Sequence, residues 1–189
     1  MSEPNLLTAE RDGDGIAVIF TNELNRNPLS VKVIELLENV FEIVENDTSI
    51  NWVRLTGTND VFASGADLNE IAKLTPETAR PFALRGQRLM KRIEDLPIET
   101  IAFVNGYCFG GALDLALACD KRIASERAKF CHPGVGLGII TGWGGTQRLP
   151  RLIGEANAME MFLTAEPIDA NESLRIGLID SIASDPKHL

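Results

Sequence analysis

Short apolar runs between polar turn residues indicate buried strands in the first half of the chain. Three runs rich in β-branched and aromatic residues occupy positions 15–20, 51–57 and 99–106. Runs of this length and composition are typical of strands that are covered on both faces. We therefore predict three interior strands.

Two longer segments have the apolar spacing of helices that pack on such strands. In residues 30–47 the apolar positions recur every three or four residues, and Ser30 is placed to cap the first turn. Residues 75–96 begin with Thr75 as a second cap, although an internal proline and Gly86 disfavour an uninterrupted helix. The order strand, helix, strand, helix, strand predicts an α/β fold.

The second half of the chain continues this alternation. We expect a short strand at 122–125, a glycine-rich turn at 141–154 and helical stretches at 158–166 and 170–177. No linker rich in proline, glycine or serine and no tandem repeat interrupts it. Residues 1–189 are therefore expected to form a single domain.

Composition narrows the classes of protein and partner. The 189 residues are 44% hydrophobic and 24% charged, which suits a soluble domain with a sizeable core. Eighteen basic against 27 acidic side chains give a formal charge of −9, which argues against nucleic acid as a partner. The three cysteines form no CxxC pair, so we expect neither a zinc site nor disulfides, and a reducing, cytoplasmic location. No membrane-spanning or targeting segment is visible.

Two glycine turns lie where a predicted strand gives way to a helix, FASGADL at 62–68 and FGGAL at 109–113. Turns at this place in α/β folds present unpaired backbone N–H groups to ligands. If the N–H groups of Ala66 and Gly111 point at one spot, they would stabilise a carbonyl oxygen as it gains negative charge. Tight packing of a buried helix is the alternative explanation for either turn alone. The glycine patterns of Rossmann and P-loop nucleotide sites are absent.

The same turns carry a resemblance to a known family. FASGADLNEI, NGYCFGGALDLALACDKRIAS, KFCHPGVGLGIITGWGGTQRLPRLIG and AMEMFLTAEPIDANESLRIGLID occur in the order and at the spacing of the enoyl-CoA hydratase/isomerase (crotonase) superfamily, over about 15–182. The resemblance implies a crotonase-like spiral of repeated ββα units forming two sheets wrapped by helices. It also implies an acyl-CoA substrate, no cofactor beyond the coenzyme A of that substrate, no metal, and a homo-oligomer that is a trimer or a dimer of trimers.

The family motifs, carried over by position, assign the site. The N–H groups of Ala66 and Gly111 become the oxyanion hole for the thioester carbonyl, which agrees with the role inferred from the turns. Trp143 is expected to be either a wall of the acyl pocket or a core residue. The residues expected to contact the substrate or its coenzyme A are Ala63, Ser64, Gly65, Ala66, Asp67, Leu68, Gly110, Gly111, Gly134 and Trp143.

The acid/base residues depart from the family pattern. Hydratases of this family place two glutamates around a water, and those positions here hold Asp114 and Gly134. The loss of one partner should cost roughly 10²–10⁴ in rate, which leaves Asp114 as the candidate acid/base residue. His132, two residues before Gly134 in a segment read as extended, is expected to lie too far away to replace the missing acid. Cys108 is expected to be a buried apolar residue and not a nucleophile.

These departures leave the reaction open. Relatives that keep the oxyanion hole but vary the acid/base set isomerise double bonds, decarboxylate, hydrolyse C–C bonds or dehalogenate. A catalytically weak or inactive homologue that keeps coenzyme A binding or assembly is the alternative. Similar proteins continue with further helices beyond the position of Leu189, and we expect these helices to be missing here. The apolar face on which they would pack is then expected to be exposed.

Overall fold

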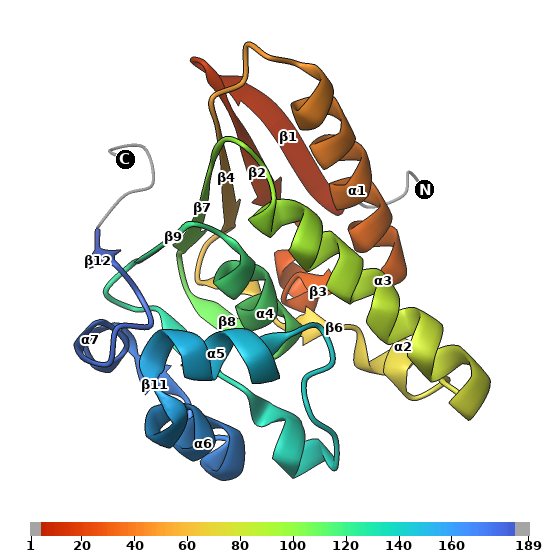
Figure 1. Cartoon of the computed structure of the whole chain (residues 1–189), viewed down its shortest axis with the longest axis vertical. Helices are drawn as coiled ribbons and strands as arrows, with labels where there is room; N and C mark the ends of the chain where they lie inside the picture. Colours follow the sequence, from red (N-terminus) through yellow and green to blue (C-terminus); the bar gives the residue numbers. More distant parts are fainter. Residues whose placement is uncertain (1–4, 184–189) are drawn as a thin grey trace.

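The computed structural model describes residues 5–183, and a six-stranded sheet is its largest element (Figure 1). Its strands, in spatial order, are β1 (Leu7–Asp12), β2 (Gly15–Phe20), β4 (Trp52–Gly57), β7 (Glu99–Val104), β9 (Lys121–Ala124) and β12 (Ser181–Ile182). β1 and β2 form an antiparallel pair, and every other neighbouring pair in this sheet is parallel. The three predicted interior strands are thus β2, β4 and β7.

Two smaller sheets lie beside the large one. The four-stranded sheet contains, in spatial order, β11 (Ile168–Asp169), β10 (Lys129–Cys131), β8 (Tyr107–Phe109) and β5 (Val61–Ala63). The remaining sheet pairs β3 (Pro28–Leu29) in parallel with β6 (Gly65–Ala66). These short strands hold the glycine turns.

Helices follow the strands along the chain. The helices of residues 5–183 are α1 (Val31–Asn46), α2 (Leu68–Ile71), α3 (Pro76–Glu94), α4 (Gly111–Ala118), α5 (Gly145–Ile153), α6 (Glu155–Thr164) and α7 (Ala170–Arg175), with short 3-10 helices η1 (Glu23–Asn25) and η2 (Pro133–Leu137). The predicted caps are present, because Ser30 accepts the N–H of Val33 at 3.3 Å and Thr75 forms a capping box. α3 continues through Gly86 without a break.

The chain repeats a unit of two strands and a helix. β4 is followed by β5, β6 and α2–α3, then β7 by β8 and α4, and β9 by β10 and α5. Each turn adds one strand to the large sheet and one or two to the smaller sheets before a helix covers them (Figure 1). The expected α/β spiral of ββα units is therefore confirmed.

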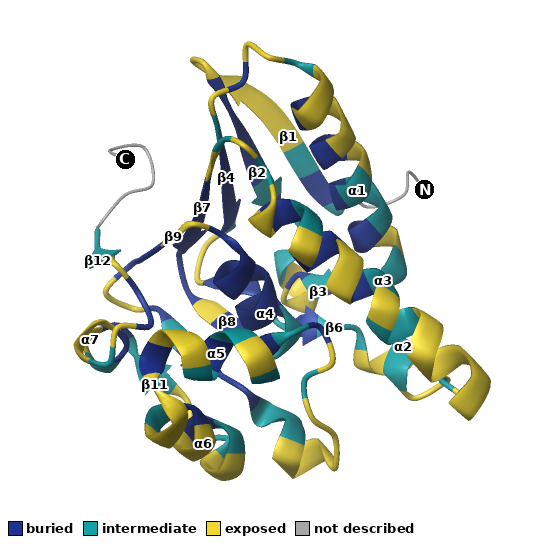
Figure 2. Cartoon of the chain, in the orientation of Figure 1, coloured by how far each residue is buried: buried dark blue, intermediate teal, exposed yellow. Residues whose placement is uncertain are grey.

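α4 is the most enclosed helix of this spiral. Its residues from Ala112 to Ala118 are all buried, and Figure 2 shows it in the interior of the molecule. A helix that is apolar on all sides belongs in the core, and Asp114 is its one charged residue. The buried position of α4 fixes the backbone on which the candidate site is built.

Candidate active site

The two glycine turns meet at the start of α4. A Cβ placed on Gly65 would lie 2.9 Å from the nitrogen of Gly111, and one placed on Gly111 would lie 3.2 Å from the nitrogen of Ala66. Gly65 also has a φ of +94°, which other residues rarely adopt. The absence of side chains at both glycines therefore lets the amides of Ala66 and Gly111 lie close together.

Neither amide is needed by the regular structure around it. Gly111 is the first residue of α4, so its N–H has no acceptor within the helix. Ala66 pairs with Leu29, and its neighbour Gly65 pairs with Pro28, which has no N–H. The ladder must therefore use the N–H groups of Gly65 and Leu29. Because successive N–H groups of a strand point to opposite sides, that of Ala66 points away from β3.

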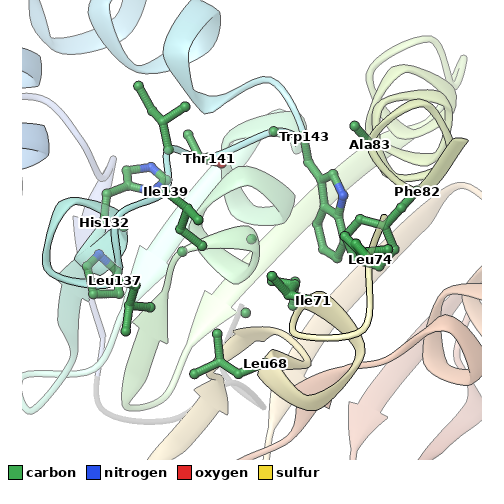
Figure 3. A pocket seen from close by; sticks show the side chains of 18 of the residues that line it. Leu68, Ile71, Leu74, Phe82, Ala83, His132, Leu137, Ile139, Thr141 and Trp143 are labelled. Carbon is green, nitrogen blue, oxygen red and sulfur yellow. The ribbon is translucent and has the colours of Figure 1, made fainter. Parts of the chain in front are cut away.

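A cavity of about 280 Å³ opens beside the two amides (Figure 3). One side of its wall comes from α2 and α3, and the other comes from η2 and the loop that follows it. His132 is the only titratable side chain among its lining residues. Apolar side chains that form the wall include Leu68, Ile71, Phe82, Leu137, Ile139 and Trp143. The cavity suits an apolar group that carries one polarisable oxygen.

Most of the predicted contact residues line this cavity. Ala63 is completely buried in β5, and Asp67 caps α2 by accepting the N–H of Asn69 at 2.7 Å, so these two support the turn and do not line the cavity. Those that do line it are Ser64, Gly65, Ala66, Leu68, Gly110, Gly111, Gly134 and Trp143.

Asp114 is buried beneath the cavity and does not line it. Its Oδ2 accepts hydrogen bonds from the hydroxyl of Thr141 and, at 3.2 Å, from the N–H of Trp143. Burial raises the pKa of Asp114 to about 6, while these two hydrogen bonds and the charge of Arg148 favour the ionised form. A carboxyl with a pKa near neutrality is suited to accept and return a proton.

His132 approaches the other oxygen of this carboxyl. Its Nε2 lies 3.6 Å from Oδ1 of Asp114, and both atoms are fully buried without a hydrogen-bond partner in residues 5–183. The distance would suit an ion pair, but burial lowers the pKa of His132 to about 4. At pH 7 a neutral imidazole therefore faces a carboxylate.

The structure differs from the sequence-based expectation in the local geometry at His132. The segment that follows it was expected to be extended, whereas residues from Pro133 to Leu137 form the 3-10 helix η2. The side chain contacts Asp114, 18 positions earlier, which no local spacing could indicate. A histidine within the proline and glycine turn was the one available signal.

Main chain packs closely at Gly134, the position where the family resemblance would place a second glutamate. A Cβ on Gly134 would lie 2.6 Å from the carbonyl oxygen of Ile139, whose N–H donates to the carbonyl of Gly134 at 2.9 Å. The loop closes on itself at this point. A side chain at position 134 would require the backbone of Ile139 to move.

Trp143 is both a cavity wall and a core residue. It is 4% exposed and lines the cavity, while its role toward an acyl group stays a prediction. Cys108 is completely buried in β8, and burial raises the pKa of its thiol well above the usual value, as expected for an apolar role.

Neither a metal centre nor a membrane span is found in the part of the chain that the structure describes. No three acidic, histidine or cysteine side chains gather there in a way that would hold a metal ion. No helix between residues 5 and 183 is long and apolar enough to cross a bilayer.

A comparison with models of protein families identifies the family of the chain. A family model described as enoyl-CoA hydratase/isomerase matches residues 11–189. The chain belongs to the enoyl-CoA hydratase/isomerase family. The resemblance seen in the sequence motifs is thereby confirmed.

Individual members of this family are similar over most of the chain. A short-chain-enoyl-CoA hydratase of Clostridium acetobutylicum is 38% identical over 188 residues, which cover 99% of this chain and 72% of that protein. A crotonyl-CoA hydratase of Syntrophomonas wolfei is 39% identical over 169 residues, 88% of this chain and 65% of the relative. The crystal structure of an enoyl-CoA hydratase from Bacillus anthracis matches with a TM-score of 0.90 at 35% identity. The match covers 95% of this chain and 70% of the chain of that hydratase. The chain thus spans about two thirds of the length of these relatives.

Proposed function

We propose that the protein binds an acyl-CoA thioester and stabilises its enolate with the N–H groups of Ala66 and Gly111. The observation that carries this proposal is the meeting of the two glycine turns at the cavity, where each lacks a side chain that would block the other's amide. Two such donors stabilise the thioester oxygen more as it becomes negative, and the loss of one typically costs about 3–4 kcal/mol of barrier. The N-terminus of α4 adds its positive end at the same point.

The substrate we infer is a short 2-enoyl-CoA. The two relatives named above are hydratases of short-chain enoyl-CoA and crotonyl-CoA. The apolar cavity, with no charged side chain in its wall, supports an acyl group as its occupant. The reaction needs neither metal nor organic cofactor beyond coenzyme A, and we infer a homo-oligomer such as a trimer.

The reaction is a proton transfer next to the thioester carbonyl, with Asp114 as its acid/base carboxyl. Hydration of a 2-enoyl thioester and isomerisation of a 3-enoyl thioester each pass through a thioester enolate, whose oxygen the two amides would stabilise. The raised pKa of Asp114, about 6, supports this role near neutral pH. Because Asp114 does not line the cavity, a neighbouring group has to carry the proton between it and the substrate.

Two readouts test this function. The carbonyl ¹³C resonance of bound, unreactive butyryl-CoA is expected to shift downfield relative to the free thioester, because the two N–H groups polarise the C=O bond. Crotonyl-CoA hydration and 3-enoyl to 2-enoyl isomerisation are then assayed, and Asp114→Asn is expected to lower kcat about 100-fold or more. Asp47→Asn, at the exposed end of α1, is the control. Equal rates in wild type and Asp114→Asn would remove Asp114 from the mechanism.

A second candidate is acyl-CoA binding without turnover. The observations that favour it are the complete burial of Asp114 and the closed loop at Gly134. It predicts the same ¹³C shift with no conversion of either thioester. A product that disappears with Asp114→Asn would reject it.

A further inference from the structure

We propose that His132 is the residue that exchanges the proton with the substrate, and that Asp114 acts behind it as a positioning residue. The inference rests on the proposed function and deepens it. It supplies a second acid/base group in a site where position 134 has no side chain.

The first observation is access. Asp114 is completely buried, with the hydroxyl of Thr141 and the backbone of Trp143 bound to its Oδ2. His132 lines the cavity beside the two amides and also a neighbouring cavity of about 550 Å³, which shares Thr141 and Ile139 with the first. A water or an acyl group in the cavity therefore meets the imidazole and not the carboxyl.

The second observation is the orientation of the ring. Within residues 5–183, the fully buried side-chain atoms without a partner include Nε2 of His132 and Oδ1 of Asp114, which lie 3.6 Å apart. Nδ1 has no hydrogen-bond partner in that range and is not one of these fully buried atoms, so it is the less enclosed nitrogen of a ring that lines both cavities. An imidazole protonated at Nε2 fits this arrangement, with its Nδ1 lone pair toward the substrate. A gap of this size between catalytic partners commonly closes when the substrate binds.

The third observation is the space made for the pair. A Cβ on Gly145 would lie 2.1 Å from Oδ1 of Asp114 and 3.1 Å from Cε1 of His132, so any larger residue would separate the two side chains. On the other side, Phe162 of α6 packs against the imidazole with ring centroids 5.0 Å apart. The ring is thus held between α6 and the start of α5.

Few other charges act on the pair. From α5, Arg148 favours the ionised form of Asp114, and from β8 the buried thiol of Cys108 faces the same carboxyl. Burial keeps His132 neutral at pH 7, and from α6 Phe162 packs against its ring while Glu155 lines the second cavity together with His132. The neutral ring is therefore a base beside a carboxylate that stabilises its protonated form.

The proton balance closes with this one pair. In hydration, Nδ1 of His132 takes a proton from water as the water oxygen bonds to C3, and the electrons of the C2–C3 double bond move into the thioester enolate. The enolate then collapses as C2 takes the proton back from Nδ1. The Nε2 proton of the imidazolium moves to Asp114, whose pKa lies above that of His132, and returns before Nδ1 gives up its proton. Water is added across the double bond, and His132 returns to its neutral form.

Nitrogen NMR tests the pairing without any need for turnover. The chain contains only two histidines, so His188→Gln assigns the signals of His132 in ¹⁵N-histidine-labelled protein. We expect the Nε2–H tautomer at pH 7.5, with a ring resonance that shifts in Asp114→Asn. An Nδ1–H tautomer, or signals that do not change in Asp114→Asn, would overturn the inference and leave the proposed function standing.

Kinetics then separate His132 from the alternative route through the hydroxyl of Thr141. We expect His132→Gln to lower kcat for crotonyl-CoA hydration or 3-enoyl isomerisation at least 100-fold, with the Kd of butyryl-CoA within threefold of wild type. Thr141→Val is expected to lose less than tenfold. The reverse ranking would assign the proton route to Thr141 and refute the role of His132. A wild type that binds butyryl-CoA but converts neither substrate would refute the proposed function, and the catalytic role of His132 with it.

Discussion

At the scale of single residues, burial shifts the two titratable groups of the site in opposite directions. It raises the pKa of Asp114 to about 6 and lowers that of His132 to about 4. The folded protein therefore binds more protons than the unfolded chain at Asp114, and fewer at His132, between about pH 4 and 6. The contribution of Asp114 to the free energy of unfolding therefore increases as the pH falls through 6. The contribution of His132 decreases as the pH falls from 6.5 to 4.

We accordingly expect the free energy of unfolding of the wild type to change little through this pair between pH 7 and pH 5. In His132→Gln only Asp114 contributes. The free energy of unfolding of this variant should increase by roughly 1–2 kcal/mol from pH 7 to pH 5, relative to the change in the wild type. Asp114→Asn should lose a similar amount. Urea unfolding at the two pH values measures both variants. The same pH dependence in all three proteins would contradict the shifted pKa values.

The sequence predicts the amide pair better than the acid/base pair. Ala66 and Gly111 were identified because glycine turns after strands have a defined backbone geometry, and the structure brings their nitrogens together. Whether they form an oxyanion hole stays a prediction. The contact between Asp114 and His132 depends on how η2 folds the loop, and residue spacing carries no information on such a long-range contact.

At the scale of elements, α3 packs closely against the turn before α5 because Gly86 has no side chain at the point of contact. Gly86 lies inside α3, where glycine is unfavourable, and a Cβ there would lie 2.3 Å from the ring of Trp143. The tryptophan thus packs directly on the backbone of α3 and also against Phe82, with ring centroids 5.7 Å apart. Gly86 was read from the sequence as a weakness of the helix, and the structure gives it a packing role.

Gly86→Ala should therefore destabilise the protein although alanine favours helix. The helical preference is worth about 1 kcal/mol, but overpacking against Trp143 typically costs 1–3 kcal/mol. We expect a net loss of stability in urea unfolding and a weaker Kd for butyryl-CoA, since Trp143 is part of the cavity wall. Arg88→Ala, at an exposed position of the same helix, is the control and should change stability by less than about 0.5 kcal/mol. Equal stability of Gly86→Ala and wild type would mean that the ring adjusts freely.

Element prediction succeeded where the apolar pattern was long. α1, α3, β2, β4 and β7 each extend over six residues or more with a clear apolar pattern. β1 was missed because most of its residues are exposed at the sheet edge. α5 was read as part of a glycine-rich turn, since it starts at Gly145 and contains Pro150. Strands of two or three residues, such as β6 and β8, are set by tertiary pairing and leave no pattern.

At the scale of the whole molecule, one face exposes apolar side chains next to the second cavity. Ile140 is 67% exposed and Leu163 of α6 is 64% exposed, and Val135 and Met159 lie on the wall of the same cavity. A contiguous apolar surface of this kind favours association between protein molecules. It is the face on which we expect copies of the chain to meet.

Analytical ultracentrifugation checks this expectation. The wild type should sediment as a multiple of its 20.6 kDa chain mass, and Ile140→Lys combined with Leu163→Lys should shift it toward the monomer. Leu24→Lys changes a side chain that is 94% exposed and lines neither cavity, so it should leave the sedimentation unchanged. A monomeric wild type at high concentration would rule out this face as a self-association surface.

The enclosure of α4 has a consequence for how a ligand enters and leaves. The amide of Gly111 belongs to a helix that is buried from Ala112 to Ala118, while the outer parts of the wall include the short helix α2, which Figure 2 shows partly exposed, and the exposed residues around η2. Local opening is easiest where few apolar contacts hold the backbone. A ligand would then enter and leave by displacing this outer wall. Its residence time would be set by α2 and η2, and not by α4, whose N-terminal amide is expected to polarise the bound carbonyl.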